Sequence, residues 1–233
     1  MKDYSIVIIG LGGIGSILCE KICRFLNYLD EVKSKVTLVD GDRFEIKNRK
    51  RQEFSLLGNK AEVKANDLKS NFNQVLVDFI PHFVNSQTIE KIVKEEDIVL
   101  LAVDNHKTRN IVSNYCKELR NVTLISGGNE LTDGDVQIYV RKEGRDLTPD
   151  LGAYHPEIRV PGDRTPEEMS CEELSKSEPQ LYFANLGAAT LMCWSFYNVV
   201  VRENYKFSEV YFDILTMLSD SKVRNPKQNG EFE

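Results

Sequence analysis

The sequence predicts an α/β fold built on a doubly wound, mostly parallel sheet that antiparallel strands extend. Short apolar runs alternate with segments of helical periodicity from residue 5 to residue 126. Such alternation is typical of a parallel sheet with helices on both faces. After Gly127-Gly128, residues 135–140 alternate between polar and apolar side chains, which is typical of an antiparallel strand.

The expected elements follow one another in a regular order. Strands are expected at 5–9, 36–40, 75–80, 97–101 and 122–126, and helices at 14–28, 60–70, 86–94 and 106–119. Residues 143–179 are rich in Pro, Gly, Asp, Glu and Ser and predict irregular structure. Residues 181–201 are apolar on nearly every side, so we expect a buried helix there. Residues 205–218 are expected to form terminal strands, and residues 219–233 a polar, frayed tail.

A glycine-rich turn, Gly10 to Gly15, connects the first strand to the first helix. In a GxGxxG turn one glycine makes the tight turn, one lets the backbone approach phosphates, and one lets helix and strand pack closely. The phosphates then lie at the helix N-terminus. Asp40 ends the second strand 25 residues after Gly15, close to the ~20 expected for an acid that binds a ribose. The sequence therefore predicts a Rossmann-like nucleotide site with an unphosphorylated ribose.

A cluster of basic residues follows Asp40 in an unusually long loop. Long loops in compact domains are often functional, and a nicotinamide-binding fold needs no cations at this point. A run of charges is most often a solvated face, and we keep that interpretation open for the first three members. The cluster comprises Lys47, Arg49, Lys50 and Arg51, with Lys60 and Lys64 beyond it.

Five ordered motifs together resemble the ThiF/MoeB superfamily, the adenylating domain shared with ubiquitin-activating enzymes, and in particular its short bacterial stand-alone form. They are Gly10 to Gly15, Asp40-Gly41-Asp42, Asn48 to Gln52, Gly58-Asn59-Lys60-Ala61 and Asp104-Asn105. The spacing from glycine to lysine is one residue shorter than in the family, so Lys60 and Lys64 both fit. We prefer Lys60 because Ala61 follows it.

The resemblance implies a single ThiF-type domain over residues 1–233. Its parts would be a nucleotide-binding core at 4–142, a crossover loop at 143–180, a C-terminal helix with strands at 181–218, and a tail at 219–233. It also implies the chemistry, in which a substrate carboxylate attacks the α-phosphate of ATP and pyrophosphate leaves. The carboxylate is already ionised, so catalysis consists of positioning and neutralisation of charge on the phosphates.

The resemblance further assigns roles to individual residues. Arg51 and Lys60 would supply the cations, and Asp104 would anchor Mg²⁺, although a helix N-cap is the alternative role for this aspartate. The nucleotide-binding set would be Gly10, Gly12, Gly13, Gly15, Asp40, Asp42, Asn48, Arg51, Gln52, Lys60, Asp104 and Asn105.

Cys171 lies where ubiquitin-activating relatives carry a thioester-forming cysteine on the crossover loop. The neighbouring Glu172 and Glu173 would raise the pKa of its thiol, so an ordinary surface thiol is the alternative. Cys19, Cys23 and Cys193 are expected in the core. The paired CxxC motifs of many relatives are absent, so we expect no zinc.

The resemblance also implies partners. The substrate would be a ubiquitin-like protein with a C-terminal glycine, and the next step either sulfur transfer or conjugation with a conjugating-enzyme-like protein. A homodimer is expected, because relatives pair through this domain and this chain lacks their N-terminal helix with its arginine. A non-catalytic scaffold subunit and an NAD-dependent oxidoreductase remain as alternatives.

Composition indicates a cytoplasmic enzyme. The net charge of −6 argues against nucleic acid or an acidic membrane as partner. We expect no membrane span, because no apolar stretch comes near the ~20 residues required. Met1 leads almost directly into the first strand, so no leader peptide is expected. The five cysteines are odd in number and scattered, which is typical of reduced thiols.

Overall fold

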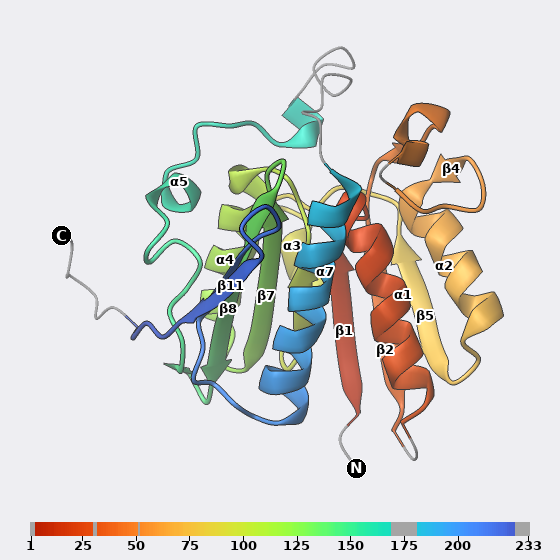
Figure 1. Cartoon of the computed structure of the whole chain (residues 1–233). Coiled ribbons are helices and arrows are strands. Elements are labelled where there is room, and N and C mark those ends of the chain that lie inside the picture. Colours follow the sequence, from red (N-terminus) through yellow and green to blue (C-terminus); the bar gives the residue numbers. More distant parts are fainter. Residues whose placement is uncertain (1–2, 30–31, 51, 169–180, 227–233) are drawn as a thin grey trace.

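The computed structural model describes residues 3–29, 32–50, 52–168 and 181–226. These residues form a nine-stranded sheet in the order β11-β10-β8-β7-β6-β1-β2-β5, with β9 paired to β8 (Figure 1). The strands are β1 (Tyr4–Ile9), β2 (Ser34–Val39), β5 (Val75–Ile80), β6 (Ile98–Leu101), β7 (Val122–Asn129), β8 (Asp133–Lys142), β9 (Arg145–Asp146), β10 (Glu209–Asp213) and β11 (Leu218–Lys222). A separate two-stranded ribbon joins β3 (Arg43–Phe44) and β4 (Gly58–Asn59).

The direction of the strands confirms the predicted fold class. Strands β7, β6, β1, β2 and β5 pair in parallel, and β8, β10 and β11 extend the sheet in antiparallel fashion. The parallel strands are apolar because both faces of this part of the sheet are covered. Strand β6, for example, is buried at all four of its positions.

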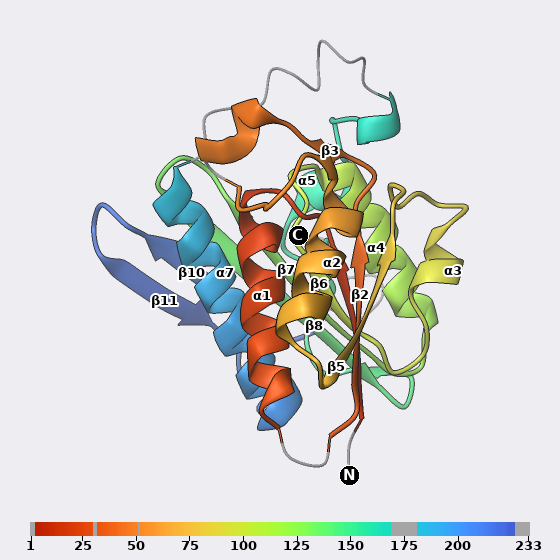
Figure 2. The same ribbon diagram turned by 90° about the vertical axis from the view of Figure 1, so that its right-hand side faces the viewer.

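Helices cover the two faces and enclose two separate cores. On one face lie α1 (Gly13–Asn27), α2 (Lys60–Asn71) and α7 (Tyr182–Phe196), and on the other α3 (Ile89–Ile92), α4 (His106–Glu118) and α5 (Pro156–Arg159) (Figure 2). Short turns of 3₁₀ helix lie at Ile46–Lys50 (η1) and Pro166–Glu168 (η2). The first core joins Ile6 and Ile8 to Leu18 and Leu68, and the second joins Val7 and Val99 to Val112.

Helix α7, which the sequence predicts to be buried, packs into the first core along one side and is exposed along the other. Its Phe196 ring packs edge-on against Phe25 of α1, 6.1 Å between centroids. Phe183, Trp194 and Tyr197, however, are 64%, 61% and 46% exposed. The helix continues through a π turn at Tyr197–Val201 (η3), and Tyr182–Val201 is long and apolar enough to cross a membrane by length and composition alone.

The statement that no apolar stretch comes near this length was therefore wrong. In this fold 56% of the apolar stretch within Tyr182–Val201 is buried against the rest of the chain, as in a core helix of a folded domain.

Two other expectations were wrong. The helix expected at 86–94 is only α3, because the Asn85 side chain accepts from the N–H groups of Gln87 and Thr88 and holds a turn there. The expected tail begins with most of strand β11, which pairs with β10. All five residues of β11 are exposed, so no alternation of apolar and polar residues indicated a strand.

Candidate nucleotide-binding site

Three of the loops singled out in the sequence meet at one edge of the sheet. The glycine turn follows β1, Asp40 follows β2 and Asp104 follows β6. These strands are neighbours and parallel, with β1 between the other two. In open α/β sheets ligands bind at this edge, outside the carboxyl ends of the strands.

The glycines of the turn have different tasks. Gly10 has φ +87°, a conformation that favours glycine, and a Cβ atom there would lie 2.6 Å from the Ala102 carbonyl oxygen. A Cβ atom on Gly15 would lie 1.9 Å from the carbonyl oxygen of Gly10. Gly12 differs, because none of the residues that the structure describes lies within 4 Å of a Cβ atom built there. Gly10 and Gly15 are therefore required by packing, whereas Gly12 keeps space open beside the turn.

The N-terminus of α1 offers its backbone N–H groups to a ligand. Gly12 is the N-cap and supplies no side-chain hydrogen bond, and the first turn contains no acidic residue. The first N–H groups of a helix have no partner within the helix, and the helix dipole favours an anion there. This arrangement suits phosphate.

Asp40 is buried and shapes the glycine turn, a role that sequence reasoning missed. Its Oδ2 accepts from the Leu11 N–H at 2.6 Å, and its Oδ1 accepts from the Asp42 N–H at 2.8 Å. Burial raises the pKa of the carboxyl, and the nearby Lys60 ammonium opposes that rise. Each carboxylate oxygen has two lone pairs, so the carboxylate retains acceptor capacity for a ribose hydroxyl.

Lys60 lies beside these acids. Its ammonium is 2.5 Å from Oδ2 of Asp42, and its backbone N–H donates to the Asp42 carbonyl at 2.9 Å. Asn59 holds this junction, because its Oδ1 caps α2 and its Nδ2 donates to the carbonyls of Asp40 and Asp42.

Lys64 points elsewhere. Its ammonium donates to the Glu53 carbonyl oxygen and lies 4.8 Å from the centroid of the Phe54 ring. Of the two lysines that fit the sequence motif, Lys60 is thus the one that the structure brings to Asp40 and Asp42.

Other predicted residues lie in the loop after β3. Asn48 is buried, and its Oδ1 accepts from the Glu45 N–H at 3.1 Å, so it holds the loop. Gln52 is 6% exposed, and its Oε1 lacks a hydrogen-bond partner in the part of the chain that the structure describes. Arg51, which directly precedes Gln52 and has a predicted catalytic role, lies outside the described residues.

Asp104 and Asn105, the two predicted residues at the end of β6, have different roles. Asn105 is the N-cap of α4, and its Oδ1 accepts from the Thr108 N–H at 2.8 Å. Asp104 is exposed and is not the cap, so the alternative role considered for it was wrong. Asp163, which sequence reasoning missed, accepts from the N–H groups of His106 and Lys107 at 2.6 and 3.0 Å.

Arg109 is another residue near the site that the sequence analysis did not single out. It is 7% exposed and donates to the Val103 carbonyl at 3.0 Å and the Gly127 carbonyl at 3.3 Å, which ties the end of β6 to β7. Burial lowers the pKa of the guanidinium, whereas Asp135 and Asp104 raise it. A weak signal existed in the sequence, because Arg109 follows Thr108 and precedes Val112 on the buried side of an amphipathic helix.

The five cysteines fall into three cases. Cys171 lies outside the described residues, so its predicted role stays a prediction. Cys19, Cys23 and Cys116 are free and buried, and burial raises the pKa of each thiol. Cys193 is partly buried, with a thiol pKa raised to about 11. Within the described ranges no group of three or more His, Cys, Asp or Glu side chains is placed to hold a metal.

Comparison with known proteins gives relatives over most of the chain. A family model described as "ThiF family" matches residues 1–217. The ubiquitin-like modifier-activating enzyme 5 of Rattus norvegicus is 27% identical over 159 residues, which cover 61% of this chain and 38% of that protein. The molybdopterin-synthase adenylyltransferase of Escherichia coli K12 is 25% identical over 149 residues, which cover 62% and 57%. The chain thus spans less than two thirds of the length of these relatives.

Solved structures share the fold. E. coli MccB, crystallised with ATP, superimposes with a TM-score of 0.73 at 20% identity and covers 97% of this chain and 64% of that one. PaaA gives a TM-score of 0.68 at 17% identity, with coverage of 94% and 64%. At these identities the likeness shows the Rossmann-like fold and its antiparallel extension.

Proposed function

Because this chain belongs to the ThiF family, we propose that it is an adenylating enzyme that transfers AMP from ATP to the C-terminal carboxylate of a small protein. The observation that carries the proposal is the meeting of the glycine turn, Lys60 and Asp104 at one edge of the sheet. The names of two relatives, an activating enzyme and an adenylyltransferase, support it.

The site fits an adenine nucleotide. Gly12 leaves open space beside the uncapped start of α1, where phosphates would lie. Asp40 would accept from the ribose. The buried Oε1 of Gln52, which has no hydrogen-bond partner among the described residues, marks a further acceptor in the predicted set. The E. coli MccB structure with ATP shows that a protein of this fold binds this nucleotide.

Asp104 would hold Mg²⁺. Magnesium binds through one or two carboxylates together with phosphate oxygens and water, and the Asp104 carboxylate is exposed at the end of β6 rather than used as a cap. When bound, the ion would neutralise charge on the phosphate oxygens.

The residues of this chain would act mainly by charge and position. The Lys60 ammonium is paired with Asp42 at 2.5 Å, so it must reach past that partner to contact a phosphate. Arg51 would supply the second cation. The attacking carboxylate carries its charge already, so no general base is required, and stabilisation of developing charge accounts for the rate.

The finer assignment concerns the substrate. We favour a ubiquitin-like protein that ends in glycine, because one relative is a ubiquitin-like modifier-activating enzyme. Structures of MccB with MccA show that a protein of this fold also takes a different partner. After adenylation, the Cys171 thiolate would attack the acyl carbon of the adenylate, break its bond to phosphate and release AMP, which leaves a thioester for conjugation or sulfur transfer.

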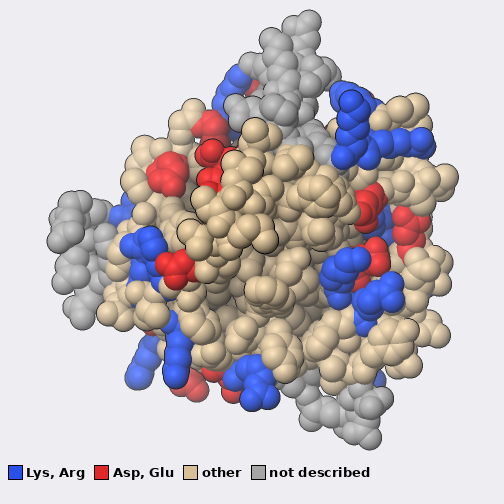
Figure 3. All heavy atoms as spheres, viewed as in Figure 1, with Lys and Arg blue, Asp and Glu red and all other residues tan. Residues whose placement is uncertain are grey.

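We also propose a homodimer through the face that carries α1 and α7. Phe183 and Trp194 of α7 and Tyr197 at the start of η3 are exposed. The middle of this face is formed by uncharged side chains, with Lys, Arg, Asp and Glu around its border (Figure 3). Exposed apolar patches of this kind often mark interfaces between proteins.

The test is adenylation of purified ubiquitin-like proteins that end in glycine and come from the same source organism. We expect ATP–pyrophosphate exchange and a substrate mass increased by one AMP. Asp104→Asn should abolish both signals, because the metal is lost. Cys171→Ala should retain exchange and lose any adduct that thiols cleave. Binding of NADH without exchange would instead favour the oxidoreductase alternative, and the absence of exchange with every substrate would favour a scaffold.

A further inference from the structure

The first turn of α7 lies against the proposed nucleotide site. A Cβ atom built on Gly13 would lie 2.3 Å from Nδ2 and 2.7 Å from Oδ1 of Asn185. The Asn185 carboxamide therefore packs directly on the start of α1. Three residues earlier, the Tyr182 hydroxyl donates to Oε1 of Glu53, in the loop that follows Arg51. This turn of α7 thus contacts two of the loops that form the site.

Asn185 is a polar residue in an apolar place. Its side chain is 0% exposed, and its neighbours Ala184, Ala188 and Ala189 belong to the core. Neither Oδ1 nor Nδ2 has a hydrogen-bond partner among the residues that the structure describes. A buried amide without partners destabilises a fold, and an apolar residue of the same shape would not. Stability alone therefore does not account for an asparagine here.

The glycine turn beside it lacks the groups that usually complete a helix start. Gly12 offers no side-chain cap, and the first turn of α1 has no acidic residue. A phosphate at this point would accept from the first N–H groups of α1. It would also bring acceptor oxygens to the side of the helix on which Asn185 lies.

We propose that Asn185 is a nucleotide-binding residue, whose Nδ2 donates a hydrogen bond to a phosphate oxygen held at the glycine turn. The buried amide reaches the phosphate when the Gly12–Gly13 peptide shifts, and two adjacent glycines permit such a shift with little strain. The proposal rests on the proposed function, because it assumes that a nucleotide binds at this turn.

The test compares ATP binding with stability in the intact chain. Asn185→Leu has nearly the same shape but no donor. We expect the variant to be as stable as wild type or more so in urea, yet to bind ATP about tenfold more weakly by calorimetry. Adenosine, which lacks phosphates, should compete equally well against a fluorescent adenosine analogue in both proteins. Asn185→Ser, which keeps a polar group but cannot reach, provides the same comparison if Asn185→Leu fails to fold.

Asn198 provides the matched control. It lies at the other end of the same helix, where its Nδ2 donates to the Trp194 carbonyl at 2.9 Å, so Asn198→Leu should leave ATP affinity unchanged. Equal ATP affinity of wild type and Asn185→Leu would overturn this inference and leave the proposed function standing. A wild-type protein that does not bind ATP at all would overturn both.

Discussion

At the scale of single residues, the glycine turn combines a rigid part with an open part. Gly15 cannot hold a Cβ atom, because the carbonyl oxygen of Gly10 would be 1.9 Å away, whereas no residue in the described ranges fills the space at Gly12. The sequence motif predicts one glycine for the approach of phosphates and one for close packing of helix on strand. The packing around each distinguishes a structural requirement from a ligand requirement.

We therefore expect opposite outcomes for two alanine substitutions. Gly15→Ala should destabilise the fold by about 3 kcal/mol, as overpacking of a filled site does, and should be measured by urea unfolding. Gly12→Ala should leave stability nearly unchanged and weaken ATP binding about tenfold, because the new methyl group enters the space beside the phosphates. Equal ATP affinity in Gly12→Ala and wild type would contradict the proposed position of the phosphates.

The two lysines of α2 provide a second comparison at this scale. Lys60→Ala should lower the rate of ATP–pyrophosphate exchange about 10²–10³-fold, the size of a lost electrostatic contact in a transition state. Lys64→Ala is the matched control, since the Lys64 ammonium donates to the Glu53 carbonyl and lies over the Phe54 ring. It should retain the exchange rate within a few-fold. A reversed result would identify Lys64 as the functional lysine.

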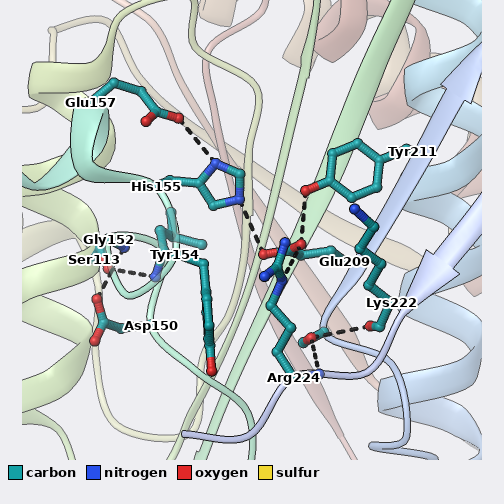
Figure 4. Close-up of polar contacts among 12 residues, drawn as sticks. Ser113, Asp150, Gly152, Tyr154, His155, Glu157, Glu209, Tyr211, Lys222 and Arg224 are labelled. Carbon is teal, nitrogen blue, oxygen red and sulfur yellow. Dashed lines mark hydrogen bonds and ion pairs between the residues drawn. The ribbon is translucent and has the colours of Figure 1, made fainter. Parts of the chain in front are cut away.

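At the scale of elements, a polar network fastens the terminal strands to the segment before α5. Nε2 of His155 lies 3.1 Å from Oε1 of Glu209, while Tyr211 and Arg224 donate to Oε2 of the same carboxylate at 2.8 and 2.7 Å (Figure 4). The other ring nitrogen of His155 contacts Glu157 at 3.0 Å. Through Arg224 the network ties a residue of the expected tail to strand β10.

The network predicts a stability that depends on pH. Burial alone would raise the pKa of Glu209, but its three hydrogen bonds outweigh burial and lower the pKa to about 2. Burial alone would lower the pKa of His155, but Glu209 and Glu157 outweigh it and raise the pKa above its ordinary value. The stabilisation by Glu209 is present above the ordinary pKa of about 4.3 and is lost as the pH falls toward 2. The stabilisation by His155 is complete below about 6.5 and is lost as the pH rises through its raised pKa.

Glu209→Gln should therefore weaken both slopes in plots of unfolding free energy against pH. The acid slope below pH 4.3 should shrink because the carboxylate is gone, and the slope above pH 6.5 should shrink because His155 loses one of its two carboxylate partners. Asp220→Asn, an exposed carboxylate on the same hairpin, should leave the slope above pH 6.5 unchanged. Profiles of Glu209→Gln that coincide with wild type would show that the network contributes nothing to stability.

At the scale of the whole molecule, the sequence predicted what depends on local pattern. The order of most strands and helices and the glycine turn were readable from spacing, whereas the lysine motif was implied by the resemblance to the ThiF/MoeB superfamily. Contacts between distant segments were not. Asp163 lies 57 residues from His106 and accepts a hydrogen bond from its N–H group. Asn185 contacts Gly13 from a helix near the other end of the chain. Strand β11 is exposed throughout, so only its pairing with β10 identifies it.

The proposed dimer is tested at this scale, because it depends on a surface rather than on one contact. The exposed aromatic side chains of α7 include Trp194, which is 61% exposed, and large aromatic residues often dominate interface energies. Trp194→Glu would place a charge in an apolar interface, so we expect light scattering to show a monomer where wild type is a dimer. Thr190, a partly buried neighbour on the same side of α7, provides the control: Thr190→Ala should leave the dimer intact.

If wild type is a monomer at micromolar concentration and still adenylates its substrate at full rate, the dimer has no part in the site. If instead Trp194→Glu is monomeric and inactive but binds ATP normally, the partner subunit contributes to catalysis and not to nucleotide binding.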